Sequence, residues 1–124
     1  MCRRVDPFDA LLGIELSPEA ARAEVRVRDE LRQRGGSVHG GVHASVADSL
    51  ACASTAAALE PDVKLTSAIA TQVSLLRPIT QGTIHAAAVA KHRGRTTWVW
   101  EVEITDNTGA LCALVRVTVG VRDR

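Results

Sequence analysis

The sequence predicts one domain of the α+β class, in which a single long helix lies across an antiparallel sheet. The first observation behind this prediction is a segment at residues 40–59 that is rich in alanine and apolar on nearly every side. The second is the strand-like patterning of the rest of the chain, in segments at residues 63–76, 83–91, 96–105 and 111–121. Short turns join these segments, so we expect four consecutive strands paired in sequence order as an antiparallel meander.

Short elements come before the long helix. Residues 8–12 are typical of a brief helix, and two brief apolar segments follow at residues 14–16 and 21–27. In the second segment apolar and charged residues alternate, which predicts a strand with one buried face. Residues 33–37 contain two glycines among polar side chains and predict a loop.

The helix predicted at residues 40–59 carries apolar residues at spacings of three and four, among them Val42, Val46 and Leu50. At 1.5 Å per residue it is about 30 Å long, roughly the width of a five- or six-stranded sheet. The sequence Glu60–Pro61–Asp62 predicts its end. We therefore expect this helix to be buried on most of its faces.

The last two strands show the clearest alternation. They are joined by Asp106–Asn107–Thr108–Gly109, a sequence typical of a tight hairpin turn. Alternation predicts that one face of each strand points into the core: Trp98, Trp100, Val102 and Ile104 in the first, and Leu111, Ala113, Val115, Val117, Val119 and Val121 in the second.

Composition limits the function. The 124 residues suit a single domain over 1–124, and a net charge of +1 argues against a nucleic-acid or membrane-surface partner. Aromatic residues make up only 2% of the chain, so an aromatic platform for single-stranded nucleic acid is not expected. The cysteines Cys2, Cys52 and Cys112 form no closely spaced pair, which predicts a reducing compartment. Since no apolar run spans a bilayer and the amino terminus lacks a secretory pattern, we expect a cytoplasmic protein.

The predicted start of the helix contains two adjacent glycines, Gly40 and Gly41. Glycine lets a ligand approach the backbone closely, and the first turn of a helix offers unpaired N–H groups with a partial positive charge. This combination suits a developing oxyanion. The alternative is that the two glycines only make a tight junction between loop and helix.

Asp48 lies two turns into the predicted helix. Its helical neighbours at three and four positions' distance include Ala44, Ala51 and Cys52, so a carboxylate is placed among small side chains. Burial of an unpaired carboxylate is costly and raises its pKa, which is typical of a general base or nucleophile. The alternative is an aspartate that faces solvent or a subunit interface.

Other reactive residues give weaker signals. His39 and His43 are four apart, as in some zinc sites, but no glutamate lies between them and we expect no metal. Ser37 lacks the G-x-S-x-G pattern of a hydrolase nucleophile. The basic turn at residues 91–95 is either a solvated hairpin end or, with the threonines after it, a phosphate contact.

Several of these residues match the pattern of a known family, over about residues 30–122. The matching sequences are Gln33, His39–Gly40–Gly41, Ala47–Asp48, Leu75–Leu76–Arg77–Pro78 and Gly94–Arg95–Thr96–Thr97. In these positions the chain resembles the hotdog-fold acyl-CoA thioesterases. Its pattern is most similar to the phenylacetic-acid-degradation thioesterases and the Arthrobacter-type 4-hydroxybenzoyl-CoA thioesterases. An aspartate rather than a glutamate as the acid favours the phenylacetic-acid type.

The resemblance implies roles for four residues. Asp48 matches the catalytic carboxylate, and Gly40 matches the residue whose backbone N–H polarises the thioester carbonyl. His39 matches the histidine that shapes this loop, and Gln33 matches the Asn or Gln of the same site. Acyl-CoA is the implied substrate, with the thioester hydrolysed to a free acid, and an aromatic acyl group is one candidate.

The remaining implied positions match less well. The family often has a water-orienting Ser or Thr where Thr66 and Ser67 lie nearby, although the best register places Ala68 there. Cys52 stands where the 4-hydroxybenzoyl subgroup has a threonine. For the nucleotide phosphates of coenzyme A, the basic turn offers Arg93, Arg95, Thr96 and Thr97.

At the level of the whole protein, the resemblance implies an antiparallel sheet wrapped around one central helix. It also implies a homodimer or homotetramer with active sites at the dimer interface. No cofactor is expected apart from the coenzyme A of the substrate. Two other functions remain open on the sequence: a hotdog module that binds acyl-CoA without hydrolysis, and a hotdog hydratase or dehydratase.

Overall fold

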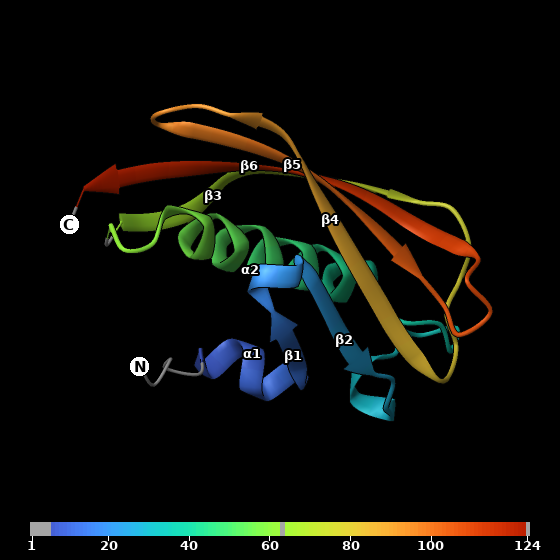
Figure 1. Ribbon diagram of the computed structural model, residues 1–124. Coiled ribbons are helices and arrows are strands. Elements are labelled where there is room, and N and C mark those ends of the chain that lie inside the picture. The colour runs from blue at the N-terminus through green and yellow to red at the C-terminus, as the bar shows by residue number, and fades with distance from the viewer. Residues whose placement is uncertain (1–5, 63, 124) are drawn as a thin grey trace.

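The computed structural model describes residues 6–62 and 64–123 (Figure 1). A six-stranded antiparallel sheet curves over one long helix, which confirms the predicted α+β hotdog architecture. In chain order the elements are α1 (Pro7–Leu12), β1 (Ile14–Ser17), η1 (Pro18–Ala20), β2 (Arg22–Arg26), η2 (Asp29–Leu31), α2 (Gly40–Leu59), β3 (Lys64–Leu75), β4 (Thr83–Arg93), β5 (Thr97–Thr105) and β6 (Leu111–Asp123).

Helix α2 has the boundaries that the sequence predicts, from Gly40 to Leu59. His39 is its N-cap and Glu60 its C-cap. The apolar residues of its inner face are fully buried against the sheet, including Val46 and Leu50 at 0% exposure. The helix therefore lies where burial of its apolar surface requires it, under the concave face of the sheet.

The order of strands differs from the predicted meander. Of the four strands predicted to form the meander, only β4, β5 and β6 pair consecutively; β3 pairs with β6, so the sheet order is β1-β2-β4-β5-β6-β3. The connection from β3 to β4 is no tight turn: it crosses to the far side of the sheet, and the Ile79 carbonyl on it accepts from the Val38 N–H at 2.8 Å. In a meander, β3 would pair with the edge of β4 that faces away from β5. Here β2 pairs with that edge instead.

The core face of β5 is as predicted, because all four of its named residues are at most 5% exposed. One residue predicted to point inward from β6 does not, since Leu111 is 36% exposed. The register shifts at this point: Thr105 pairs with Leu111 but Ile104 pairs with Ala113. Cys112 is thus the extra residue of a bulge, and it takes a buried position beside Ala113.

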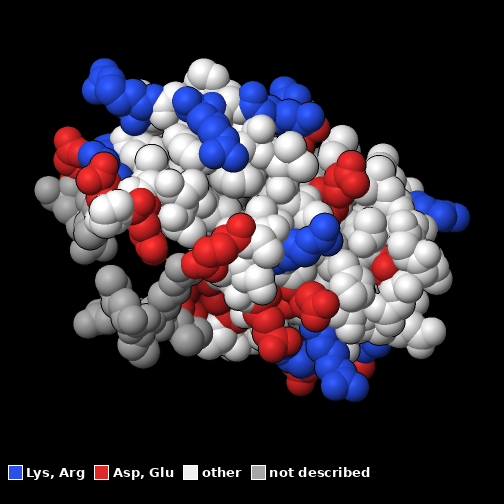
Figure 2. Space-filling view, in the orientation of Figure 1, with Lys and Arg blue, Asp and Glu red and all other residues white. Residues whose placement is uncertain are grey.

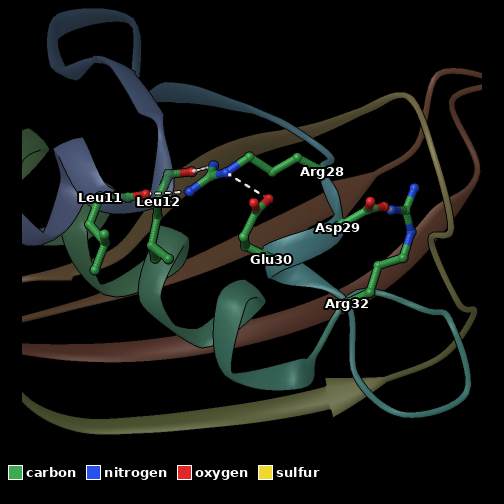
Figure 3. Close-up of polar contacts among 6 residues, drawn as sticks. All are labelled: Leu11, Leu12, Arg28, Asp29, Glu30 and Arg32. Carbon is green, nitrogen blue, oxygen red and sulfur yellow. Dashed lines mark hydrogen bonds and ion pairs between the residues drawn. The ribbon is translucent and has the colours of Figure 1, made fainter.

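Helix α1 is held at both ends. The Asp6 carboxylate caps its start and accepts from the Phe8 N–H at 2.8 Å. At its other end the Arg28 guanidinium donates to the carbonyl oxygens of Leu11 and Leu12, the latter at 2.9 Å (Figure 3). Since Arg28 follows β2, this contact ties the first helix to the sheet.

Two further observations concern the cysteines and the membrane. Cys52 and Cys112 are free thiols, and Cys2 lies outside the described residues. In the part of the chain that the structure describes, no helix has the length and apolar character needed to cross a bilayer.

Candidate active site

Three of the residues predicted for the site lie in the loop before α2 and at the first residue of the helix. His39 Nδ1 accepts a hydrogen bond from the Gly41 N–H at 2.8 Å, so the histidine shapes the loop in which Gly40 lies. Gln33 belongs to the same loop and donates from Nε2 to the Ser37 hydroxyl at 3.0 Å. No acceptor for the Gly40 N–H is found among residues 6–62 and 64–123, so this donor is free for a ligand.

Gly40 also lies against β3. A Cβ atom at this position would be 2.9 Å from Leu75 Cδ1, closer than real Cβ contacts. A side chain at position 40 would therefore displace Leu75, which is 61% exposed and can move. The absence of a side chain leaves room for an atom to reach the backbone N–H.

Asp48 lies further along α2 and lines a different cavity, with a volume of about 700 Å³. This cavity is enclosed by residues from α1, β1, η1, α2 and β3: Asp6, Asp9, Ile14, Leu16, Pro18, Asp48, Ser49, Cys52, Ala53, Ala56, Thr66, Ser67 and Ala68. Burial raises the pKa of Asp48 above the ordinary range of an aspartate, and the nearby Asp9 and Asp6 carboxylates raise it further. A raised pKa of this kind is compatible with a general base or nucleophile.

The Cys52 thiol is the hydrogen-bond donor to this carboxylate, with its Sγ 3.8 Å from Asp48 Oδ1. Burial and the Asp48 charge raise the pKa of the Cys52 thiol to about 12. The thiol is therefore protonated at neutral pH and is not itself a nucleophile.

Asp9 is a member of this cavity that the sequence did not indicate. It is only 7% exposed, and its Oδ1 accepts from the Ser49 hydroxyl at 2.5 Å. Burial raises the pKa of Asp9 as well. On α1 the apolar Phe8 and Leu11 are exposed instead, the reverse of what hydrophobicity predicts. No local sequence pattern could have identified Asp9.

The predicted water-orienting region lies beside Asp48. Thr66, Ser67 and Ala68 all line the Asp48 cavity. The Thr66 hydroxyl donates to the Cys52 carbonyl oxygen at 3.1 Å, so its proton is used in a contact with the second half of α2. Ser67 is exposed and Ala68 half-buried.

Within a single chain, the predicted oxyanion-binding residue Gly40 lies apart from the predicted catalytic carboxylate of Asp48. Gly40 and Asp48 are on the same helix, eight residues apart, which separates them by about 12 Å along its axis. One thioester carbon cannot contact the N–H of the first and the carboxylate of the second within one chain. Gln33, His39 and Gly40 thus form one cluster, and Asp48 with Thr66 and Ser67 forms another.

The residues predicted to bind phosphate lie at the β4–β5 turn. Figure 2 shows Lys and Arg side chains along the top of the molecule, where Figure 1 places this turn. The Arg93 guanidinium lies 5.0 Å from the centre of the Trp98 ring. Arg95 and Thr96 are exposed, and Thr97 is half-buried at the start of β5. This exposure is compatible with either a phosphate contact or a solvated turn.

The residues considered for zinc are not arranged as ligands. His39 Nδ1 is occupied by the Gly41 N–H, while His43 is 2% exposed. Among the described residues no group of three His, Cys, Asp or Glu side chains is placed to hold a metal ion.

Comparison with known proteins supplies the family. The family model for the Thioesterase superfamily matches residues 35–113, which include Gly40 and Asp48. The 1,4-dihydroxy-2-naphthoyl-CoA hydrolase of Listeria monocytogenes is 34% identical over 116 residues, covering 91% of this chain and 94% of its own length.

Two solved structures share the fold over most of their length. The AziG protein of S. sahachiroi is 31% identical, with a TM-score of 0.89; the match covers 98% of this chain and 100% of the AziG chain. The thioesterase HI1161 of Haemophilus influenzae is 28% identical, with a TM-score of 0.86 over 94% of this chain and 82% of its own. By sequence and by fold, the chain belongs to the Thioesterase superfamily and is a thioester hydrolase.

Proposed function

We propose that the chain hydrolyses acyl-CoA to a free acid and coenzyme A at a site shared by two subunits. In this site Asp48 of one subunit and the Gly40 N–H of the other act on the same thioester. The observation that carries the proposal is the position of Asp48 and Gly40 on one helix, about 12 Å apart, with only Asp48 beside the large cavity. Two helices packed side by side and antiparallel bring each Asp48 near the Gly40 of the other.

The chemistry needs few groups because a thioester is already activated. Asp48 either removes a proton from water as the water oxygen attacks the carbonyl carbon, or attacks that carbon itself to give an anhydride that water then opens. In both routes the carbon–sulfur bond breaks and the coenzyme A thiolate takes up a proton. The Gly40 N–H, assisted by the dipole of α2, stabilises the negative oxygen that forms in between.

The other residues of the Gly40 cluster have supporting roles. His39 holds the loop through the Gly41 N–H, which leaves the neighbouring Gly40 N–H free. Gln33 positions the thioester or the water. Thr66 and Ser67 line the cavity in which water reaches Asp48. We propose no cofactor and no metal ion.

We assign the nucleotide phosphates of coenzyme A to the basic turn, with Arg93, Arg95, Thr96 and Thr97 as contacts. Guanidinium groups bind phosphate through paired N–H donors, and Arg95 is exposed for such a contact. An aromatic acyl group is a candidate because the Listeria relative is named for the hydrolysis of an aromatic CoA ester.

The assembly proposed is a homodimer or homotetramer in the cytoplasm. Strand β3 is an edge strand of twelve residues, and it exposes the large apolar side chains Leu65, Ile69 and Leu75. An exposed apolar edge strand is a template for pairing with another strand. Pairing of β3 with the β3 of a second copy is the arrangement that would bring the two α2 helices together. The free thiols of Cys52 and Cys112 support a reducing compartment.

The test is subunit complementation. Asp48→Asn removes the base or nucleophile and is expected to lower kcat by roughly 10²–10⁴. Gly40→Val is expected to block the oxyanion site in a second, separately inactive variant. In a shared site, a mixed dimer of the two variants contains one intact site and one doubly damaged site. Random mixing of equal amounts therefore restores about a quarter of the wild-type rate, as expected for a two-fold dimer.

Release of free thiol from acyl-CoA measures the rate. Asp62→Asn is the matched control, because Asp62 is an exposed aspartate just beyond α2. No restoration on mixing contradicts the shared site. Near-wild-type turnover by Asp48→Asn contradicts the role of Asp48. Tight binding of acyl-CoA without thiol release favours the binding module, and addition of water to an enoyl-CoA favours the hydratase.

A further inference from the structure

Three hydroxyl groups line the Asp48 cavity, those of Ser49, Thr66 and Ser67. Ser67 is exposed, and the Thr66 hydroxyl gives its proton to a neutral backbone carbonyl oxygen at 3.1 Å. The Ser49 hydroxyl gives its proton to the Asp9 carboxylate, with Oγ 2.5 Å from Oδ1. A hydrogen bond to a charged acceptor is roughly twice as strong as one to a neutral acceptor. Of the three hydroxyl groups, Ser49 therefore has the most firmly held proton.

Ser49 also lies beside the proposed catalytic carboxylate. It directly follows Asp48 in α2, so their Cα atoms are about 3.8 Å apart, and both side chains line the cavity of about 700 Å³. The same two side chains line a smaller cavity of about 290 Å³ between α1, α2 and β3. They therefore face the same space, where the two cavities meet. A water molecule that reaches the Asp48 carboxylate in this space has the Ser49 hydroxyl within reach.

Asp9 fixes the direction of the hydrogen bond to Ser49. Asp9 is 7% exposed, and its helix α1 is held in place by Arg28. A carboxylate only accepts hydrogen bonds, so the Ser49 proton points toward Asp9 and the lone pairs of Oγ are left to accept from another donor. The negative charge behind the hydroxyl polarises it and strengthens it as an acceptor.

Resting on the proposed function, we propose that Ser49 orients the water that attacks the thioester, with Asp9 as the positioning residue behind it and Asp48 as the base. One O–H of the water donates to Ser49 Oγ and the other to the Asp48 carboxylate, so a lone pair of the water oxygen faces the carbonyl carbon. As the carbon–oxygen bond forms, the second proton passes to Asp48. The carbon–sulfur bond then breaks, and the coenzyme A thiolate takes up that proton.

The test uses the two protons of water. Methanol attacks the same thioester to give a methyl ester, but its one hydroxyl proton goes to Asp48 and none is left for Ser49. Hydrolysis therefore depends on the Ser49 oxygen, while methanolysis does not. In buffer containing methanol, Ser49→Ala is expected to slow formation of the free acid by about 10- to 100-fold with little change in KM. The ratio of methyl ester to free acid is expected to rise by the same factor.

Variants of Asp9 separate orientation from space. Asp9→Leu removes the acceptor but leaves the Ser49 side chain in place, and is expected to raise the product ratio as well. Asp9→Asn keeps an oxygen that accepts the Ser49 proton, so it is expected to retain most of the wild-type ratio. The double variant Asp9→Leu/Ser49→Ala is expected to be no slower than Ser49→Ala, because both residues act on one water. Ser54→Ala is the matched control, since Ser54 is a serine of α2 that does not line the Asp48 cavity; its rate and ratio stay as in the wild type.

The product ratio comes from the folded, active fraction alone, so it does not depend on how much of a variant folds. A wild-type rate and ratio in Ser49→Ala would overturn the inference. Equal losses of ester and acid would also overturn it, because the bond between Ser49 and Asp9 would then only hold α1 in place. A ratio raised by Ser49→Ala but not by Asp9→Leu would reflect the space left by the hydroxyl, and the inference would be wrong. Absence of thiol release by the wild-type protein from every acyl-CoA contradicts the proposed function, and the inference with it.

Discussion

The carboxyl groups of Asp48 and Asp9 line the same cavity, and the charge of Asp9 acts on Asp48. Because the Asp9 carboxylate raises the pKa of Asp48, Asp48 ionises at a higher pH than it would alone. Asp48 acts as a carboxylate, so activity is present above its pKa and is lost as the pH falls through it. Asp9→Asn removes a negative charge. We therefore expect it to move the acidic limb of the kcat/KM profile to lower pH.

The measurement is kcat/KM against pH for the wild type and Asp9→Asn, with Glu15→Gln as the control because Glu15 is an exposed acid on the adjacent β1. A limb that stays in place or moves to higher pH contradicts the coupling.

The raised pKa values also mean that the folded protein binds protons more readily than the unfolded chain. The free energy of unfolding from these two groups thus declines as the pH rises through their pKa values, and Asp9→Asn reduces that decline.

These residues differ in how far the sequence can predict them. The surroundings of Asp48 are set by helical neighbours a few positions away, so an α-helical pattern is enough to place it among small side chains. Asp9 is buried by its contact with Ser49, forty positions along the chain, and no local pattern contains that contact. The same holds for His43: its burial depends on the loop and strand that line the cavity beside it, and within the described residues its Nδ1 has no hydrogen-bond partner.

At the scale of elements, α1 forms one wall of the Asp48 cavity and depends on Arg28 for its position. Arg28→Met removes the donors to the Leu11 and Leu12 carbonyls but keeps an unbranched side chain. A hydrogen bond that involves a charged group contributes about 1.5–3 kcal/mol, so we expect a loss of that size in the free energy of unfolding. We also expect the α1 amides to exchange hydrogen faster than in the wild type, while the exchange rates of the α2 amides stay the same. Arg26→Met is the control, since Arg26 is exposed on β2; equal exchange in both variants contradicts the role of Arg28.

The elements themselves were largely predictable, but their neighbours were not. Alternation indicates which face of a strand is buried, so the core faces of β5 and most of β6 follow from the sequence. It does not say which strand lies alongside. The pairing of β3 with β6 is decided by the long connection through Ile79 and by β2 at the edge of β4, and both involve contacts distant in sequence. The outward turn of Leu111 likewise follows from a bulge that alternation cannot show.

At the scale of the whole molecule, the edge strand and the divided site have the same explanation. A single copy leaves β3 without a partner on one side and leaves Gly40 far from Asp48. Pairing of two β3 strands about a two-fold axis would cover the exposed apolar edge and complete two sites at once. Assembly and catalysis are therefore expected to be lost together.

Ile69→Lys tests this directly. Ile69 is the extra residue of a bulge in β3 and is 65% exposed, so a lysine there does not disturb the core of one subunit. A charged residue on an edge strand opposes strand pairing, and in a dimer the two lysines would face each other near the axis. We expect light scattering to show a folded monomer, and kcat to fall at least as far as in Asp48→Asn, roughly 10²–10⁴. Val89→Lys is the matched control, because Val89 is 58% exposed and lies on β4 rather than on the edge strand β3; this variant is expected to remain assembled and active. A monomer of Ile69→Lys with wild-type turnover would show that one chain carries a complete site.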